Sequence, residues 1–574
     1  MSCKFISELR RLSKLSAEAV QNIESFDPLK TYLHVTRQPE EDFRNLMLRI
    51  SGINHKQLIL VCGSAGDGKS HLLSYLKFAD SQHILNGYAL INDATESNAP
   101  TATAIETLAE RIAAFRDDRI DDGGCEKVVL AINLGMLNNF IDSPYGNNFS
   151  RLRNYVINNR IFSVEDPMPF DKNGVFQHID FSDYQLYSLT ADGPKSNYLT
   201  ELLGKIFANT PNNPFYSAYT SSSSCPHHSH CPVRHNFEFL MSKTVQAMLV
   251  QRIIEICVKE KLIVTSRDVL NFVFDAIASP DFDDKKFWQT ISNPTKFLEA
   301  YISYTTPMLM FENSGTSDLL DLMSANNTHS GSIEDRDTDL LSFYAADDIT
   351  ATVSNVLGHT KYAEMVLSCN LQAIDNSRDD LKKYVFKFLM HFQNLANPES
   401  LMVDKTYIEF VADLYNSRAG HRMKLRELYS TVKNSIYTWD GAYGNDLICI
   451  DDTNDDYCIL EQLIIESDVI PGTGEAEVFR FTPSISVRFS NEAGSNNVRF
   501  SIDYSLYKLI KAMREGYCPT SQDRNIHADF VSSIRELAEF GSKKARVMIV
   551  PKRKTASRKY MFKAGGFGYS FKEV

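Results

Sequence analysis

The sequence predicts an α/β core built on a parallel sheet, followed by a helical region and a C-terminal α+β domain with antiparallel strands. Apolar strand patterns alternate with helical patterns between residues 58 and 135, which is typical of a parallel sheet covered on both faces. Long helical patterns follow at 236–278 and 361–438. After Trp439 the pattern changes to short alternating runs broken by glycine-containing turns, which indicates antiparallel strands.

A chain of 574 residues exceeds the size of one ordinary hydrophobic core, so several domains are expected. The expected segments are an N-terminal helical segment (1–50), the core with a helical lid (51–280), a helical region (281–438) and a β-rich α+β domain with basic C-terminal strands (439–574). The stretch near 312–350 is polar and acidic with few large apolar residues. We therefore expect a mobile loop there.

The core strands are predicted from four short apolar runs. These runs are LILVC (58–62), YALIN (88–92), KVVLAINLG (127–135) and VFQHIDF (175–181). Helices are expected from about residue 69 and from about 101 to 115. Runs that are apolar throughout, rather than alternating, are what strands buried on both faces require.

Composition limits the kind of function that the chain can have. Apolar residues make up 43% and charged residues 23%, with a net charge of −12. This acidic balance argues against non-specific coating of nucleic acid, so any DNA contact must come from a local basic patch. We find no signal peptide, no apolar run of membrane-spanning length and no disulfide framework among the ten cysteines. A cytoplasmic protein without a membrane partner is expected.

A glycine-rich turn separates the first predicted strand from the helix that follows. Residues 63–70 read GSAGDGKS, which fits the phosphate-binding pattern G-x-x-x-x-G-K-[ST] with the required strand and helix on its flanks. Glycines let successive N–H groups point at one anion, and the helix adds its positive end. Lys69 can reach the β- and γ-phosphates of ATP, and the Ser70 hydroxyl can hold Mg²⁺. The predicted nucleotide-binding residues are Gly63, Ser64, Ala65, Gly66, Asp67, Gly68, Lys69 and Ser70. The sequence thus predicts an α/β P-loop NTPase, AAA+/STAND-like, with a helical lid.

Hydrolysis of ATP also needs an acid near the phosphates. One predicted core strand ends at Asn133, where an aspartate is usual in such a sheet; asparagine lacks the charge but can position a water or sense a γ-phosphate. The alternatives are Asp93 and Glu96 after another strand, or Asp180 and Asp183 after a third. Each of these residues can equally be an ordinary helix cap.

Arg267 opens a predicted helix after a short apolar run, in LIVTSRDVLNFVFDAI. An arginine in this position can reach back to a γ-phosphate and report on its presence. A salt bridge to Asp268 or to a neighbouring helix is the alternative, and the sequence does not decide between them.

Cysteines and histidines cluster in CPHHSHCPVRH, residues 225–235. Thiolate and imidazole are the ligands that Zn²⁺ favours, so a structural zinc site is one interpretation. Its predicted ligands are Cys225, His228, His230 and Cys231. The spacing is not C-x₂-C and the loop is short, so a solvated histidine-rich loop with reduced thiols is the other interpretation.

The C-terminal stretch 543–572 contains ten Lys/Arg and no acid. Lysine and arginine contacts to phosphates dominate DNA affinity, and aromatic rings can stack on bases. The predicted DNA-binding residues are Lys552, Arg553, Lys554, Arg558 and Lys559, and the aromatic residues near them are Tyr560, Phe562, Phe567 and Tyr569. A solvated strand edge protected by lysines and a docking face for an acidic partner are the alternatives.

Several stretches beyond the glycine turn resemble one protein family. These are QLILVCGSAGDGKSHLLSYLK, NDATES, LAINLGMLNNF, DFSDYQLYSLT, NPFYSAY, CPV, TSRDVLNF and, late in the chain, IDYSLYKLI and EGYCP. From about residue 20 to the end, the chain is similar to the DptF (DndF) family, the F subunits of bacterial DNA phosphorothioation-dependent restriction systems. The resemblance implies antiviral defence in which this subunit, with the G and H subunits, restricts double-stranded DNA that lacks phosphorothioate. The P-loop of the family corresponds here to residues 63–70.

Two functions follow as competing expectations. The first is ATP hydrolysis that drives DNA engagement in a restriction complex; the second is a nucleotide-binding scaffold that assembles the partner subunits with little hydrolysis. An apoptotic-type signalling NTPase is a weaker third reading, because the chain lacks a repeat sensor domain. The acidic turn CIDDTNDDY (449–457) has no partner lysine pattern, so no nuclease activity is predicted. The oligomeric state is left open, homo-oligomers included.

Overall fold

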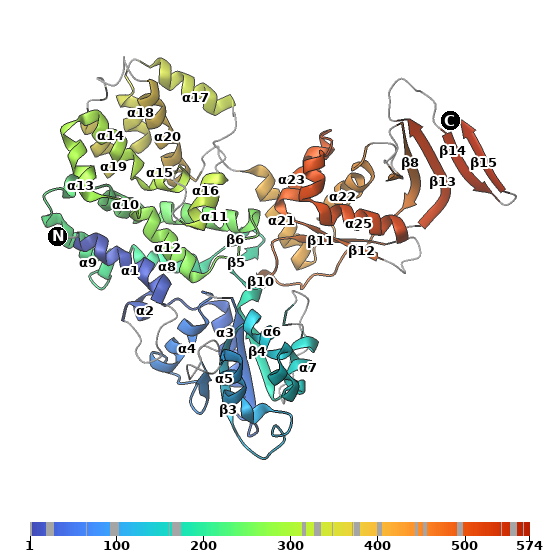
Figure 1. Cartoon of the computed structure of the whole chain (residues 1–574). Helices are drawn as coiled ribbons and strands as arrows, with labels where there is room; N and C mark the ends of the chain where they lie inside the picture. Colours follow the sequence, from blue (N-terminus) through green and yellow to red (C-terminus); the bar gives the residue numbers. More distant parts are fainter. Residues whose placement is uncertain are drawn as a thin grey trace.

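Three parts make up the computed structural model (Figure 1): a core sheet drawn in blue and cyan, a helical region drawn mostly in green and yellow together with blue helices from the N-terminus, and a C-terminal part in orange and red. The structure describes residues 3–18, 28–64, 66–91, 103–159, 161–162, 174–312, 317–326, 334–346, 348–369, 371, 379–398, 404–441, 446–451, 456–490, 497–540, 542–551, 560–565 and 568–573.

The core is a four-stranded parallel sheet. Its strands, in spatial order, are β2 (Ala89–Ile91), β3 (Lys127–Asn133), β1 (Gln57–Gly63) and β4 (Phe176–Asp180). The central strand β1 is buried along its whole length. Gly63 lies level with Asn133 on β3, and Cys62 lies level with Asp180 on β4. Because all four strands are parallel, these residues share the carboxyl edge of the sheet, where ligands of open α/β sheets bind.

Helices cover both faces of this sheet. The helices on one face are α3 (Gln38–Ile50) and α4 (Lys69–Phe78), and those on the other are α5 (Ala104–Arg111), α6 (Leu134–Asp142) and α7 (Ser150–Asn158). Ile59 and Val61 of β1 pack with the first set, and Leu58, Leu60 and Cys62 pack with the second. The two faces therefore follow the period of two that a strand imposes, and the predicted sheet covered on both faces is confirmed.

The helical region surrounds one large hydrophobic core. Its earlier helices are α1 (Lys4–Glu18), α2 (Pro28–Leu33), α8 (Asn197–Ile206), α9 (Pro214–Ser221), α10 (Pro232–Leu240), α11 (Lys243–Lys259) and α12 (Ser266–Ile277). Its later helices are α13 (Asp284–Gln289), α14 (Pro294–Ser303), α15 (Thr306–Phe311), α16 (Asp318–Ala325), α17 (Glu334–Ala345), α18 (Thr350–Leu357), α19 (Lys361–Ser368), α20 (Asp379–Ala396), α21 (Lys405–Ala419) and α22 (Arg426–Thr438). Among the described residues, no helix has both the length and the apolar character that crossing a membrane requires.

The stretch near 312–350, predicted to be a loop, contains helices α16 and α17 among its described residues. Leu319, Leu320 and Met323 of α16 are buried in the large core, and so is Phe343 of α17. The prediction of a loop was wrong for these segments because their few apolar residues fall at helical spacing and find a core to pack against.

The C-terminal part contains antiparallel sheets, as predicted. One sheet has the order β12 (Asn497–Ile502), β11 (Ile485–Ser490), β9 (Glu466–Ser467), and the other has the order β15 (Gly568–Glu573), β14 (Tyr560–Gly565), β13 (Ser542–Pro551), β8 (Tyr457–Ile464), β7 (Leu447–Asp451). The helices of this part are α23 (Tyr504–Arg514), α24 (Ser521–Ile526) and α25 (Ala528–Phe540).

A third small sheet joins the C-terminal part to the segment that follows the core. Strand β10 (Glu477–Arg480) pairs with β5 (Tyr184–Thr190), which in turn pairs with β6 (Gly193–Lys195). In Figure 1 these strands lie where the three parts meet. A strand from beyond Trp439 is therefore built into a sheet with residues from the predicted core segment.

Candidate functional site

The turn between β1 and α4, residues 63–70, is here called the glycine loop; all of it except Ala65 is described. Gly66 and Gly68 have φ angles of +91° and +94°, in the region that side chains other than glycine avoid. A Cβ atom on Gly66 would lie 3.0 Å from Thr265 Oγ1. Gly68 precedes α4 as its N-cap and offers no side-chain oxygen to the first turn, so the amides there can serve an anion.

Two charged side chains brace the glycine loop from inside. Lys69 Nζ donates a hydrogen bond of 2.6 Å to the carbonyl oxygen of Ser64, and the Asp67 carboxylate accepts one from the Ser64 amide. Both charged residues are buried. Burial raises the pKa of the Asp67 carboxyl, although Lys69 and the Ser64 amide oppose the shift. These two contacts hold the loop as a turn, with the Lys69 ammonium group directed at the Ser64 carbonyl oxygen.

Arg37, at the N-terminus of α3, is a contact of the glycine loop that sequence reasoning missed. Its guanidinium donates a hydrogen bond of 2.7 Å to the Asp67 carbonyl oxygen. The guanidinium also lies 5.8 Å from the centre of the Phe181 ring and 5.4 Å from that of Tyr198, within the range of cation–π attraction. The sequence around Arg37 indicates only a helix start, so no local signal could have found this contact.

The N-terminus of α12 lies directly against the glycine loop. Thr265 caps this helix in a capping box with Asp268, which accepts both the Thr265 amide and its hydroxyl, at 2.9 and 2.7 Å. Arg267 is in the first turn, and its Nε has no hydrogen-bond partner among the described residues. No ion pair joins it to Asp268 within the described part of the chain. The helix start that carries Arg267 thus lies at the glycine loop, and a contact of Arg267 with a γ-phosphate stays a prediction.

The polar residues predicted at the carboxyl edge, Asn133 and the candidate acids, have different environments. Asn133 Oδ1 accepts the Met136 amide at 2.6 Å and caps α6, so the side-chain NH₂ is the group that it can offer to a ligand. Asp183 is paired with Arg480 of β10. Asp180 is buried and accepts the Ser182 amide at 2.9 Å, and burial raises its pKa to about 6. Asp93 and Glu96 lie outside the described residues.

Two cavities meet at Asp180. One, of about 510 Å³, runs along the outer edge of β4 between α3 and α7. The other, of about 480 Å³, lies between the carboxyl end of β4 and residues of the C-terminal part such as Phe481 and Phe530. Asp180 lines both of them. Asp180 is therefore a buried carboxyl with a raised pKa that lines two cavities, which makes it a candidate functional residue.

The side chains of the Cys/His loop have other partners. His227 stacks on Trp288 with ring centres 4.3 Å apart, and His228 Nδ1 lies 2.8 Å from the Cys225 carbonyl oxygen. Burial raises the pKa of the Cys231 thiol to about 11, which disfavours the thiolate that zinc needs. No group of three or more ligating side chains gathers in the part of the chain that the structure describes. The zinc site stays a prediction.

The five predicted DNA-binding residues of the basic tail, Lys552 to Lys559, lie outside the described residues, and so does Phe567. Strands β13 and β14 flank them. Tyr560 and Phe571 stack with ring centres 5.3 Å apart on neighbouring strands, so Tyr560 is engaged within the sheet.

No family model matches the chain, and no curated protein does either. What the geometry defines is an α/β protein whose glycine loop leaves a buried parallel strand, enters a helix, and carries a buried lysine.

Proposed function

We propose that the protein binds ATP at the glycine loop and hydrolyses it as a subunit of a phosphorothioation-dependent restriction complex that acts on unmodified DNA. The observation that supports nucleotide binding is the loop itself: left-handed glycines and a buried Lys69 between a central parallel strand and a helix N-terminus. The restriction role, with the G and H subunits and double-stranded DNA as partners, is supported by the resemblance of the sequence. DNA contact is assigned to the basic tail.

Each residue of the site has a role in this proposal. Lys69 exchanges its bond to the Ser64 carbonyl for the β- and γ-phosphates, and the amides of the glycine loop hold the phosphate oxygens. Ser70, the second residue of α4, is the residue that would hold Mg²⁺, which supplies charge neutralisation when bound. Arg267 reaches toward the γ-phosphate from the first turn of α12.

Asp180 is proposed as the base that takes a proton from the attacking water. A carboxyl with a pKa of about 6 is close to the pH of the cytoplasm, and general bases work best when the two match. Asn133 lies at the end of β3, the strand on the other side of β1. Its side-chain NH₂ can donate a hydrogen bond to a phosphate bound at the carboxyl edge of the sheet. Asp93 and Glu96 stay as alternative acids.

Binding and turnover of ATP by Lys69→Ala test this proposal. We expect wild-type protein to bind Mg–ATP in a calorimetric titration and to release phosphate faster when unmodified duplex DNA is present. Lys69→Ala should bind at least about tenfold more weakly, because it loses a charge-assisted contact to phosphate, and should not turn over. Lys77→Ala, which removes an exposed lysine from the same helix, is the matched control. The proposal would be contradicted if Mg–ATP produced no binding heat and no thermal shift in folded wild-type protein.

A scaffold function is the second candidate, and the observation that favours it is Asn133. This residue stands at the carboxyl edge level with Gly63, carries no charge, and is used as a helix cap. A scaffold would bind Mg–ATP with the same dependence on Lys69 but would release no phosphate with any DNA. Phosphate release measured with bare and with phosphorothioated duplexes separates the two functions.

A further inference from the structure

The segment that connects α2 to α3, residues 34–37, touches the glycine loop at one end and helix α4 at the other. It is here called the connector. Its last residue, Arg37, has extended backbone angles and precedes the first turn of α3. Its first residue, His34, is buried. The connector comes before β1 in the chain, so neither contact follows from neighbourhood in sequence.

Arg37 holds one particular peptide group of the glycine loop. The hydrogen bond of 2.7 Å from its guanidinium ends on the carbonyl oxygen of Asp67, and that carbonyl belongs to the same peptide as the Gly68 amide. In a trans peptide the C=O and N–H bonds point in opposite directions. Holding the carbonyl toward Arg37 therefore turns the Gly68 N–H away from Arg37, to the opposite side of the loop.

This orientation is not fixed by the loop alone. Gly68 and Gly66 flank Asp67 and both have positive φ angles, and glycine populates both halves of the backbone map with little preference. The Asp67–Gly68 peptide has such a glycine on one side, so it can turn over with little cost in the backbone of Gly68. The turned peptide would present a carbonyl oxygen to an anion in place of an amide. The Arg37 guanidinium, as a fixed donor on the outside of the loop, disfavours the turned peptide. The loop therefore loses less conformational entropy when an anion binds.

Arg37 is in turn fixed by residues of the helical region and the core. Its guanidinium lies near the rings of Phe181 and Tyr198. Arg37 and Ser266, at the start of α12, both lie next to Gly68: a Cβ there would be 3.7 Å from the Arg37 guanidinium and 3.9 Å from Ser266 Oγ. Burial lowers the pKa of Arg37, against the opposing effects of Tyr198 and Asp67, but a guanidinium stays charged in proteins. Arg37 therefore lies among the two helices α8 and α12 and the loop.

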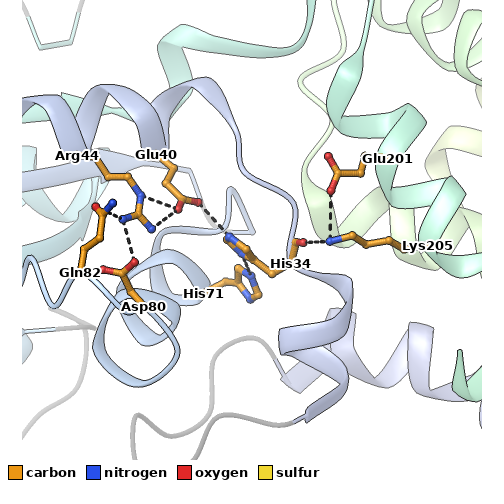
Figure 2. A network of polar contacts seen from close by, with 8 residues as sticks. All are labelled: His34, Glu40, Arg44, His71, Asp80, Gln82, Glu201 and Lys205. Atoms are coloured by element: carbon orange, nitrogen blue, oxygen red, sulfur yellow. Dashed lines mark hydrogen bonds and ion pairs between the residues drawn. The ribbon is translucent and has the colours of Figure 1, made fainter. Parts of the chain in front are cut away.

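His34 anchors the other end of the connector, as Figure 2 shows. Its Nδ1 lies 3.0 Å from Nε2 of His71, the residue after Ser70, and its ring stacks on Tyr75 one turn further along α4. Lys205 of α8 donates a hydrogen bond to the His34 carbonyl oxygen. His34 Nε2 also faces Glu40 at 3.3 Å. The first turn of α4 and helix α8 are thus both tied to the connector.

The far side of this network is closed by an arginine. Arg44 bonds Glu40 at 2.9 Å and Asp80 at 3.0 Å, and both carboxylates are buried (Figure 2). A buried charge network of this kind fixes its members in one arrangement only when each has its partner. The network links the connector, through Glu40 and Arg44 of α3, to Asp80 just after α4.

We propose that the connector is a positioning element of the phosphate site and that Arg37 orients the Asp67–Gly68 peptide so that its amide faces the phosphates of a nucleotide. This inference rests on the proposed nucleotide binding at the glycine loop. Arg37 itself is a positioning residue: it acts through the loop peptide, from outside the loop.

The test measures Mg–ATP binding by Arg37→Ala and Arg37→Lys beside wild type. Arg37→Ala should bind about 10- to 100-fold more weakly, since a charge-assisted hydrogen bond and the orientation that it gives are lost. Arg37→Lys should be intermediate, because lysine can donate to the Asp67 carbonyl but lacks the planar group that packs against rings. Arg151→Ala is the matched control: this arginine forms a two-bond contact with Asp121 on the exposed surface.

Two further readouts separate positioning from general damage. Methylguanidinium in millimolar amounts should restore much of the affinity of Arg37→Ala and leave Arg151→Ala unchanged. Without any nucleotide, hydrogen exchange of the peptide that covers the glycine loop should be faster in Arg37→Ala than in wild type.

Wild-type affinity together with wild-type exchange in Arg37→Ala would overturn the inference and leave the proposed function intact. The same holds if affinity is lost but methylguanidinium does not restore it and exchange is unchanged. If wild-type protein itself binds no Mg–ATP, both proposals fail.

Discussion

At the scale of single residues, side chains of the same type at the carboxyl edge of the sheet have different environments. Asp180 and Asp183 are three positions apart, yet Asp183 is paired with Arg480 while Asp180 is buried beside two cavities. Burial raises the pKa of Asp180 to about 6, because a charged carboxylate loses hydration there. Environment, rather than residue type, therefore selects the candidate base.

Asp180→Asn and the pH dependence of turnover test this assignment. Above pH 6 the carboxyl is ionised and can accept a proton, so kcat should rise as the pH increases through about 6 and then level off. Asp180→Asn should lower kcat about 100-fold or more, in line with the usual contribution of general bases, with little change in Mg–ATP affinity. Asparagine keeps an oxygen for the Ser182 amide, so the turn should survive. Full turnover by Asp180→Asn would assign the base elsewhere, with Asp93 and Glu96 next.

At the scale of elements, the glycine loop works because other elements close around it. Helix α12 brings Thr265 against Gly66, and the connector brings Arg37 against Asp67. The capping box at Thr265 satisfies amides of α12 itself, so this helix start supports the loop rather than competing for its ligand. The conformation of the glycine loop therefore depends on α12 and on the connector as well as on the sequence of the loop.

Gly66→Ala, compared with Gly87→Ala, isolates the contribution of α12. Both glycines have similar φ angles, +91° and +85°, but a Cβ on Gly66 meets Thr265 at 3.0 Å and one on Gly87 meets nothing within 4 Å. Each change should cost about 1 kcal/mol of stability or more, since alanine is strained at positive φ. Gly66→Ala should also lose Mg–ATP affinity at least about tenfold, because the loop must shift away from α12. If the two variants bind Mg–ATP with equal affinity in a titration, the contact between Gly66 and α12 does not contribute to nucleotide binding.

At the scale of the whole molecule, the core and the C-terminal part are joined by strand pairing and by charge. Strand β10 pairs with β5, Arg480 of β10 bonds Asp183, and Glu477 of the same strand bonds Ser188 at 2.6 Å. Asp183 is close in sequence to Asp180. Coupling between two sites needs an element that both of them bias, and β10 is the element that reaches from the C-terminal part to the candidate site.

Arg480→Ala should therefore weaken the effect of DNA on ATP turnover more than turnover itself. The ion pair is partly exposed, so its loss should cost only about 1 kcal/mol of stability or less. Phosphate release without DNA should stay near the wild-type value, while the stimulation by unmodified duplex should fall severalfold. Arg488→Ala, which removes an ion pair to Asp468 inside the C-terminal part, is the control. If unmodified duplex DNA stimulates ATP turnover by Arg480→Ala as strongly as by wild type, the Arg480–Asp183 pair does not couple DNA binding to turnover.

The amino-acid sequence by itself determined the features that are encoded in contiguous residues. The glycine loop, its strand and its helix are read from residues 58 to 77, and the antiparallel C-terminal strands from their alternation after Trp439, since backbone freedom and side-chain period are local properties. Even the helices near 312–350 are present in that stretch as apolar spacing, although its polar composition hid them.

Only the tertiary structure decided which distant residues complete the site. Arg37 contacts the glycine loop although it precedes Asp67 by 30 positions, and Thr265 contacts it from far later in the chain. Strand β10 likewise pairs with β5 across nearly 300 residues. No periodicity encodes such contacts, because they depend on how whole helices and strands pack to bury their apolar faces. The loop chemistry is therefore written in the sequence, while its orientation and its connection to the C-terminal part arise from packing.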